Sequence, residues 1–171
     1  MENTSSRKLK VLWLHGVFGS AAMMDYQIDY YKYLFKDYIE FVSLNGPYQC
    51  SKEIVDPEIS SKFSGPYFAW YTFDPESKQV KNYIESLEYV IDFINKNGPF
   101  DGILAYSQGI NISRVLIKLE KLGSEYPKIP FENLNLLYSL VHHYWKLIIQ
   151  IMLIQYLSLG ERTLMYLFYI E

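Results

Sequence analysis

An apolar strand that stops at a sharp turn, with a helical pattern directly after it, constrains this chain more than any other feature. Ile103–Ala105 predicts a buried strand, and the turn after it is Tyr106-Ser107-Gln108-Gly109. The residues two before and two after Ser107, Ala105 and Gly109, are small, as so tight a turn requires. The pattern favours a nucleophile elbow over a serine in an ordinary loop, with Ser107 strained above a helix N-terminus.

Strands and helices are expected to alternate along the first two thirds of the chain. We expect strands over Leu9–Leu14, Ile39–Leu44 and Ile103–Ala105, and helices over Ala21–Lys36, Ser77–Lys96 and Asn111–Leu122. Such alternation predicts an α/β fold, in which a parallel sheet carries helices on both faces.

The segment Tyr48–Pro75 has no sustained hydrophobic period, and it contains an aromatic block at Gly65–Tyr71. Connections of this length are uncommon unless they are functional or disordered, and the aromatic content argues against disorder. Two interpretations stay open here: a flap over a pocket, or a surface loop held in place by its own aromatic side chains.

Length and composition indicate one globular domain. The chain has 171 residues, short for an α/β hydrolase, which commonly has roughly 200–250. A net charge of −3 gives no electrostatic reason to expect nucleic acid. The single Cys50 excludes an internal disulfide and is expected to be a structural thiol. We find no secretory signal or metal-ligand motif, and we expect a cytoplasmic protein without metal or cofactor.

The composition changes sharply near Asn135. Residues Leu136–Leu159 are almost wholly apolar, which raises the question of a membrane span. The interruption by His142, His143 and Lys146 argues against a span, so we expect a buried helix or one that a protein partner covers. The predicted organisation is a flexible lead-in over 1–8, a hydrolase-like domain over 9–135 and an atypical apolar segment over 136–171.

Several blocks of the sequence resemble the FSH-type serine hydrolases, which are small α/β-hydrolases. The matching residues are Val11-Leu12-Trp13-Leu14-His15-Gly16, Ser20-Ala21, Gln27, Gly65-Pro66-Tyr67-Phe68-Ala69-Trp70, Ser86-Leu87, Tyr89-Val90 and Gly98-Pro99-Phe100-Asp101-Gly102-Ile103-Leu104-Ala105-Tyr106-Ser107-Gln108-Gly109. The last block is the most specific, and the likeness covers roughly residues 9 to 120. It implies an α/β-hydrolase-like fold.

The resemblance also implies a site. Ser107 would attack a small-molecule ester or thioester and form an acyl-serine intermediate. The N–H groups of Val17 and Gln108 would form the oxyanion hole. His15 is not expected to be the general base, because it precedes the elbow whereas this fold places its histidine last.

The acid and the histidine that such enzymes carry near their end are not found. The nearest look-alike of the acid segment is Gly160-Glu161-Arg162-Thr163, in which Thr163 stands where an aspartate belongs. The histidines after Ser107 are His142 and His143, which we expect at the edge of a helix; the acids that could orient them as a base are Glu120, Glu125 and Glu132. The general base is therefore unknown.

Two explanations of this ending stay open: a shifted reading frame or retained intron, and a degenerate paralogue that keeps the pocket without the chemistry. Under either explanation the sheet would lack late strands and would expose an apolar edge, so we expect poor solubility or dependence on a partner. The expected function is a serine hydrolase of the esterase or thioesterase type with weakened or no turnover. A second interpretation is a catalytically inactive binding module. A third is a fragment anchored to a membrane through Leu136–Leu159.

Overall fold

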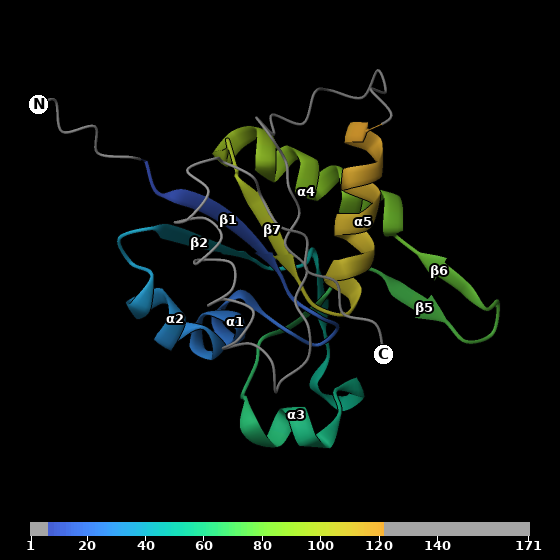
Figure 1. Cartoon of the computed structure of the whole chain (residues 1–171). Helices are drawn as coiled ribbons and strands as arrows, with labels where there is room; N and C mark the ends of the chain where they lie inside the picture. Colours follow the sequence, from blue (N-terminus) through green and yellow to red (C-terminus); the bar gives the residue numbers. More distant parts are fainter. Residues whose placement is uncertain (1–6, 122–171) are drawn as a thin grey trace, which may run out of the picture.

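A three-stranded parallel sheet forms the centre of the structure, a computed structural model that describes residues 7–121. The strands are β1 (Leu9–Leu14), β2 (Ile39–Leu44) and β7 (Gly102–Ala105), in the order β2-β1-β7. β1 pairs in parallel with both neighbours and so lies in the middle (Figure 1). All three strands expected from the apolar runs are confirmed.

Helices cover both faces of this sheet, as the alternating pattern predicts. The helices of the described chain are α1 (Ala21–Gln27), α2 (Asp29–Leu34), α3 (Pro57–Lys62), α4 (Tyr83–Asn97) and α5 (Gln108–Lys121), with a turn of 3-10 helix over Lys52–Ile54. α3 has no buried residue and lies away from the sheet (Figure 1). Leu12 and Leu14 of β1 pack in one apolar cluster with α4 and α5, whereas Val11 and Trp13 pack in a second cluster with α1. Because successive side chains of a strand point to opposite faces, β1 is apolar at four consecutive positions.

The helix predicted over Ala21–Lys36 is in fact two helices. Ser20 caps α1 by accepting a hydrogen bond of 3.2 Å from the Met23 N–H. At Ile28 the backbone leaves helical geometry, with φ −104° and ψ 6°, and α2 starts at the next residue. Met24, Ile28 and Phe35 are all buried. The apolar spacing identifies the buried face correctly, but it does not reveal the break in the helix at Ile28.

The segment Tyr48–Pro75 is more ordered than its sequence suggests. β3 (Tyr48–Cys50) pairs antiparallel with β4 (Tyr67–Ala69), and α3 lies between them. Within the aromatic block, Tyr67 is 3% exposed and Trp70 is completely buried. Tyr67 and Trp70 therefore belong to the interior, whereas Phe68 and Tyr71 are half-buried. A flap and a surface loop stay open for the segment as a whole.

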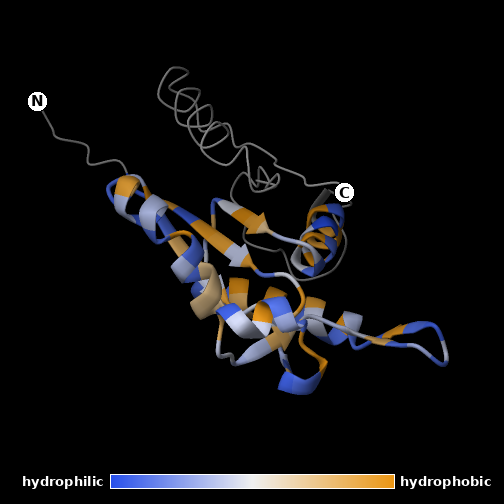
Figure 2. Ribbon diagram, turned by 90° about the horizontal axis from the view of Figure 1, so that it is seen from below, coloured by the Kyte–Doolittle hydropathy of each residue, from blue (hydrophilic) through white to orange (hydrophobic). Residues whose placement is uncertain are grey.

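The helix predicted over Ser77–Lys96 starts later, as α4. The residues before it form β6 (Gln79–Lys81), which pairs antiparallel with β5 (Thr72–Asp74). The Asp74 carboxylate accepts hydrogen bonds from two following backbone N–H groups, of Glu76 and Ser77, and such local bonds favour a turn over a helix. Val80 therefore lies on an exposed hairpin, which projects from the body of the molecule (Figure 2).

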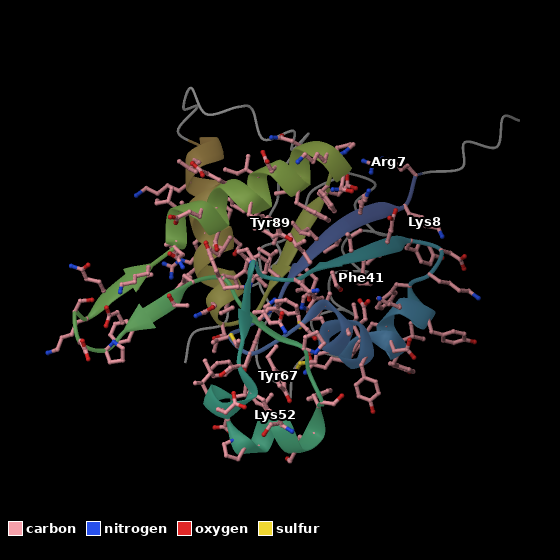
Figure 3. All side chains as sticks on the ribbon, turned by 180° about the vertical axis from the view of Figure 1, so that it is seen from behind. Arg7, Lys8, Phe41, Lys52, Tyr67 and Tyr89 are labelled. Atoms are coloured by element: carbon pink, nitrogen blue, oxygen red, sulfur yellow. The ribbon has the colours of Figure 1, made fainter. Side chains whose placement is uncertain are left out.

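An ion pair holds β7 beside β1. Asp101, whose side chain is 9% exposed, accepts two hydrogen bonds of 2.7 Å from the Arg7 guanidinium and one of 2.8 Å from the Lys10 N–H. Figure 3 shows Arg7 where the chain enters β1. The aspartate of the most specific sequence block thus has a structural contact that fixes the start of the strand leading to Ser107.

The predicted apolar segment Leu136–Leu159 and the predicted domain boundary at 135 lie outside the described residues. Within residues 7–121, none of the helices combines the length and the apolar character that crossing a bilayer requires.

Candidate active site

Ser107 adopts the strained backbone that a nucleophile elbow needs. Its φ is 49°, in the left-handed region that costs a residue other than glycine roughly 1–2 kcal/mol. β7 ends two residues earlier at Ala105 and α5 begins at the next residue, Gln108. Ser107 is exposed, although the strand before it is buried along its whole length. The fold therefore presents the Ser107 hydroxyl to solvent directly after a core strand.

Gly109 makes this sharp turn sterically feasible. A Cβ atom at this position would lie 2.4 Å from the Leu14 carbonyl oxygen and 2.9 Å from that of His15. Both contacts are with backbone, which cannot rotate away as a long side chain can. The first turn of α5 therefore approaches the end of β1 more closely than any larger residue would permit.

The loop after β1 lies directly against the elbow. A Cβ atom on Gly16 would be 2.8 Å from Cδ1 of Tyr106 and 3.1 Å from Cβ of Ser107. The Gly19 N–H donates to the Gly16 carbonyl at 3.0 Å and closes a turn. Phe18 has a φ of 61°, as the third position of a type II turn requires. Two left-handed residues thus occur in the two segments that meet at this site.

Two backbone N–H groups at this junction could bind an oxyanion. In α5 the N–H groups of Gly109 and Ile110 already donate to the Tyr106 and Ser107 carbonyls. Gln108 is the first residue of the helix, so its N–H has no acceptor within the helix. Val17 is the second residue of the turn after β1, and its N–H takes no part in the bond that closes the turn. These are the two donors predicted from the sequence, and their role stays a prediction.

His15 is held in one neutral tautomer. It is completely buried. Its Nε2 accepts a hydrogen bond of 2.8 Å from the Gly46 N–H, so Nδ1 carries the proton and donates to the Gly16 carbonyl at 2.6 Å. Burial lowers the pKa of His15 from 6.5 to about 4, against the opposing effect of the bond to Gly16. Because both ring nitrogens are occupied, His15 cannot take a proton from Ser107.

The Gln108 side chain connects the elbow to the buried aromatic block. Its Oε1 accepts from the Trp70 N–H at 3.0 Å, and its Nε2 donates to the Tyr71 carbonyl at 3.1 Å. The Trp70 indole in turn donates to the His15 carbonyl at 2.7 Å, and the Ser86 hydroxyl donates to the Trp70 carbonyl. The turn at Ser107, the end of β1 and the aromatic block are therefore joined by hydrogen bonds. The sequence identifies these blocks as similar to the family, but it does not predict the hydrogen bonds that connect them.

Replacement of Gln108 by methionine tests this connection. The variant keeps the side-chain volume and leaves the buried Trp70 N–H without its acceptor, so we expect a loss of about 1–3 kcal/mol in the free energy of unfolding. Gln49→Met on β3 is the matched control, because Gln49 is exposed. Urea unfolding of both variants would measure the difference, and equal stability of the two would show that the Gln108 bonds contribute nothing.

The remaining sequence candidates cannot be placed. His142, His143, Glu125, Glu132 and Gly160–Thr163 lie outside the described residues, and so does the side chain of Glu120. Within residues 7–121 no group of three or more histidine, cysteine or acidic side chains could hold a metal ion. Cys50 is half-buried, and burial raises the pKa of its thiol, which disfavours the reactive thiolate.

Known proteins with related sequences include several esterases. The chain is 31% identical over 121 residues to esterase C25G4.2 of Caenorhabditis elegans, covering 70% of this chain and 55% of that protein. It is 30% identical to esterase alnB of Emericella nidulans, covering 61% of this chain and 34% of that protein. A dihydrofolate reductase of Schizosaccharomyces pombe is 30% identical over 69% of this chain and 28% of its own length.

The chain thus spans about half or less of each of these relatives. The family model described as serine hydrolase (FSH1) matches residues 3–140, which include β1, the aromatic block and the elbow. The match covers well over half of the sequence. The protein therefore belongs to the FSH1 serine hydrolase family.

Proposed function

We propose that the protein is a serine hydrolase of the esterase or thioesterase type in which Ser107 is the nucleophile. The observation that carries this proposal is the left-handed backbone of Ser107, at φ 49°, in an exposed turn against Gly16. A fold that holds a serine in this conformation stores strain, and such strain is concentrated at functional sites. The esterase names of the relatives support the same class of reaction.

The chemistry that follows is acyl transfer through a covalent intermediate. The Ser107 hydroxyl attacks the ester carbonyl, a base takes its proton, and the alcohol or thiol leaves; water then releases the acid. The N–H groups of Val17 and Gln108 would stabilise the oxyanion, and each such donor contributes on the order of 3 kcal/mol to the transition state. These donors are main-chain groups held by the hydrogen bonds of His15 and the Gln108 side chain, so they are oriented before the substrate arrives.

A second function is a binding module with the same fold and no turnover. It is favoured by the state of His15, the one histidine within residues 7–121, which is locked in a neutral, fully bonded form. A serine hydroxyl needs a base to react at neutral pH. Under this alternative the site around Ser107 binds an ester or its product without cleaving it.

A fluorophosphonate probe distinguishes the two functions. We expect covalent labelling of the full chain at Ser107, mapped by peptide mass spectrometry, and none in Ser107→Ala. Ser51→Ala is the matched control, because Ser51 is exposed and distant in sequence from the elbow. Hydrolysis of p-nitrophenyl butyrate that Ser107→Ala abolishes would establish turnover. A folded protein that neither reacts with the probe nor hydrolyses the ester would support the binding module.

A further inference from the structure

The Tyr106 ring lies against Gly16, directly beside Ser107. A Cβ atom on Gly16 would be 2.8 Å from Cδ1 and 3.2 Å from Cε1 of Tyr106, which are bonded neighbours on one side of the ring. Gly16 is not among the residues with a positive φ, so its backbone conformation alone would accept a larger residue. What excludes a side chain at Gly16 is therefore the Tyr106 ring, together with the Ser107 Cβ at 3.1 Å.

The Tyr106 ring is fixed through its backbone but exposed at its side chain. The Tyr106 N–H donates to the Leu14 carbonyl at 3.0 Å, and the Tyr106 carbonyl accepts from the Gly109 N–H at 2.9 Å. The residue is nonetheless 53% exposed. Because a half-exposed ring buries little apolar area, it contributes less to folding than a core side chain does. Core packing therefore does not explain why an aromatic ring lies at this position.

The peptide that links Gly16 to Val17 is already held at its carbonyl. The Gly16 carbonyl oxygen accepts hydrogen bonds from His15 Nδ1 at 2.6 Å and from the Gly19 N–H at 3.0 Å. In a trans peptide the carbonyl and the following N–H point in opposite directions within one plane, so the Val17 N–H points away from the His15 ring. Hydrogen bonds to one oxygen leave the peptide able to pivot about that atom, whereas a ring packed on the Gly16 α-carbon restricts the pivot.

We propose that Tyr106 is a positioning residue, whose ring holds the peptide between Gly16 and Val17 so that the Val17 N–H can stabilise the oxyanion. The inference rests on the proposed function, because it takes Ser107 as the nucleophile and Val17 as one donor. Tyr106 acts through Gly16 and does not touch the reacting atoms. The ring carbons are the atoms of Tyr106 nearest to Gly16, so the ring carries the role and the phenol hydroxyl does not.

Kinetics of Tyr106→Ala and Tyr106→Phe test this role. We expect Tyr106→Ala to lower kcat for p-nitrophenyl butyrate by roughly tenfold with little change in KM, a fraction of the loss that removing a whole oxyanion donor causes. Tyr106→Phe keeps the ring and should keep kcat, and both variants should unfold in urea close to the midpoint of the unaltered protein. An unchanged kcat in Tyr106→Ala would overturn the proposal.

Tyr38→Ala is the matched control for these kinetics. Tyr38 is 48% exposed, close to the value for Tyr106. It directly precedes β2, whereas Ser107 follows β7, so the two residues lie at opposite ends of the parallel sheet. We expect Tyr38→Ala to leave both kcat and KM unchanged.

A double-mutant cycle separates this role from a general disturbance of the turn. Gly16→Ala places a methyl group against the Tyr106 ring, so we expect it to slow fluorophosphonate labelling of Ser107 by roughly tenfold. In the Tyr106→Ala background the ring is absent, and Gly16→Ala should then slow labelling by less than about threefold, since residues in contact have non-additive effects. Equal effects of Gly16→Ala in the two backgrounds would contradict the proposed contact.

The NMR order parameter of the Val17 N–H separates failure of this inference from failure of the proposed function. It should fall in Tyr106→Ala and stay unchanged in Tyr106→Phe, whether or not Ser107 reacts. If Ser107 is labelled at the same rate in Tyr106→Ala and in the unaltered protein, and the order parameter is unchanged, the positioning role is overturned and the hydrolase stands. If the order parameter falls in Tyr106→Ala but the unaltered protein neither reacts with the probe nor cleaves the ester, the ring holds the peptide and the hydrolase fails.

Discussion

Replacing Gly109 by alanine is expected to destabilise the protein by about 3 kcal/mol or more, at the upper end of what overpacking a core costs. The added methyl would lie 2.4 Å from the Leu14 carbonyl oxygen, so α5 would have to move away from the end of β1. That movement would break the 3.0 Å hydrogen bond between the Tyr106 N–H and the Leu14 carbonyl, which fixes the elbow. Urea unfolding measures the loss of stability, and fluorophosphonate labelling measures the displacement of Ser107.

Lys118→Ala is the control for this prediction, because Lys118 lies on the exposed face of the same helix. We expect this change to alter stability by less than about 0.5 kcal/mol, as is usual for surface positions. If Gly109→Ala leaves both the unfolding free energy and the labelling of Ser107 unchanged, α5 lies farther from the end of β1 than the 2.4 Å contact implies.

Stability is expected to fall by about 3 kcal/mol as the pH is lowered from 6.5 to 4, because of His15 alone. The pKa of His15 is about 4 in the folded protein and 6.5 without the fold. Above pH 6.5 the imidazole is neutral in both states, so its contribution to stability is complete. Between these pH values the unfolded chain binds a proton that the folded protein excludes, and stability therefore decreases. Below pH 4 both states are protonated, and this contribution stays constant.

The measurement is the free energy of unfolding in urea at several pH values from 4 to 8. His15→Asn is the matched variant, because asparagine keeps a donor and an acceptor but does not titrate. We expect this variant to be less stable at neutral pH and to lose most of the pH dependence in this range. The same slope in both proteins would show that other groups cause the acid sensitivity and that His15 is not the buried neutral group.

Sequence patterns reveal the main strands and the turn at Ser107, because each depends on residues that are close together in the chain. Four consecutive apolar residues in β1, from Val11 to Leu14, predict a strand buried on both faces, and both faces are covered. The small residues around Ser107 predict a sharp turn, and the backbone there is left-handed. The sequence mispredicts the start of α4, because the Asp74 side chain bonds to nearby backbone and forms a turn. It also predicts one helix over Ala21–Lys36, where the structure has a break at Ile28.

The contacts that orient the site could not be predicted in this way. Trp70, Ser86 and Gln108 are far apart in the chain, and their pairing depends on how α4, α5 and the aromatic block pack together. Hydrophobic periodicity carries no information on which polar groups meet across such distances.

The amino-acid sequence by itself determined the parallel sheet and the sharp turn at Ser107, because each depends on neighbouring residues or on chain order. Only the tertiary structure decided that His15 is a neutral group bonded to Gly16 and Gly46, and that the Gln108 side chain joins the elbow to Trp70. Burial and partners arise from packing between distant segments, and it is this packing that keeps His15 neutral and that joins the turn at Ser107 to the aromatic block.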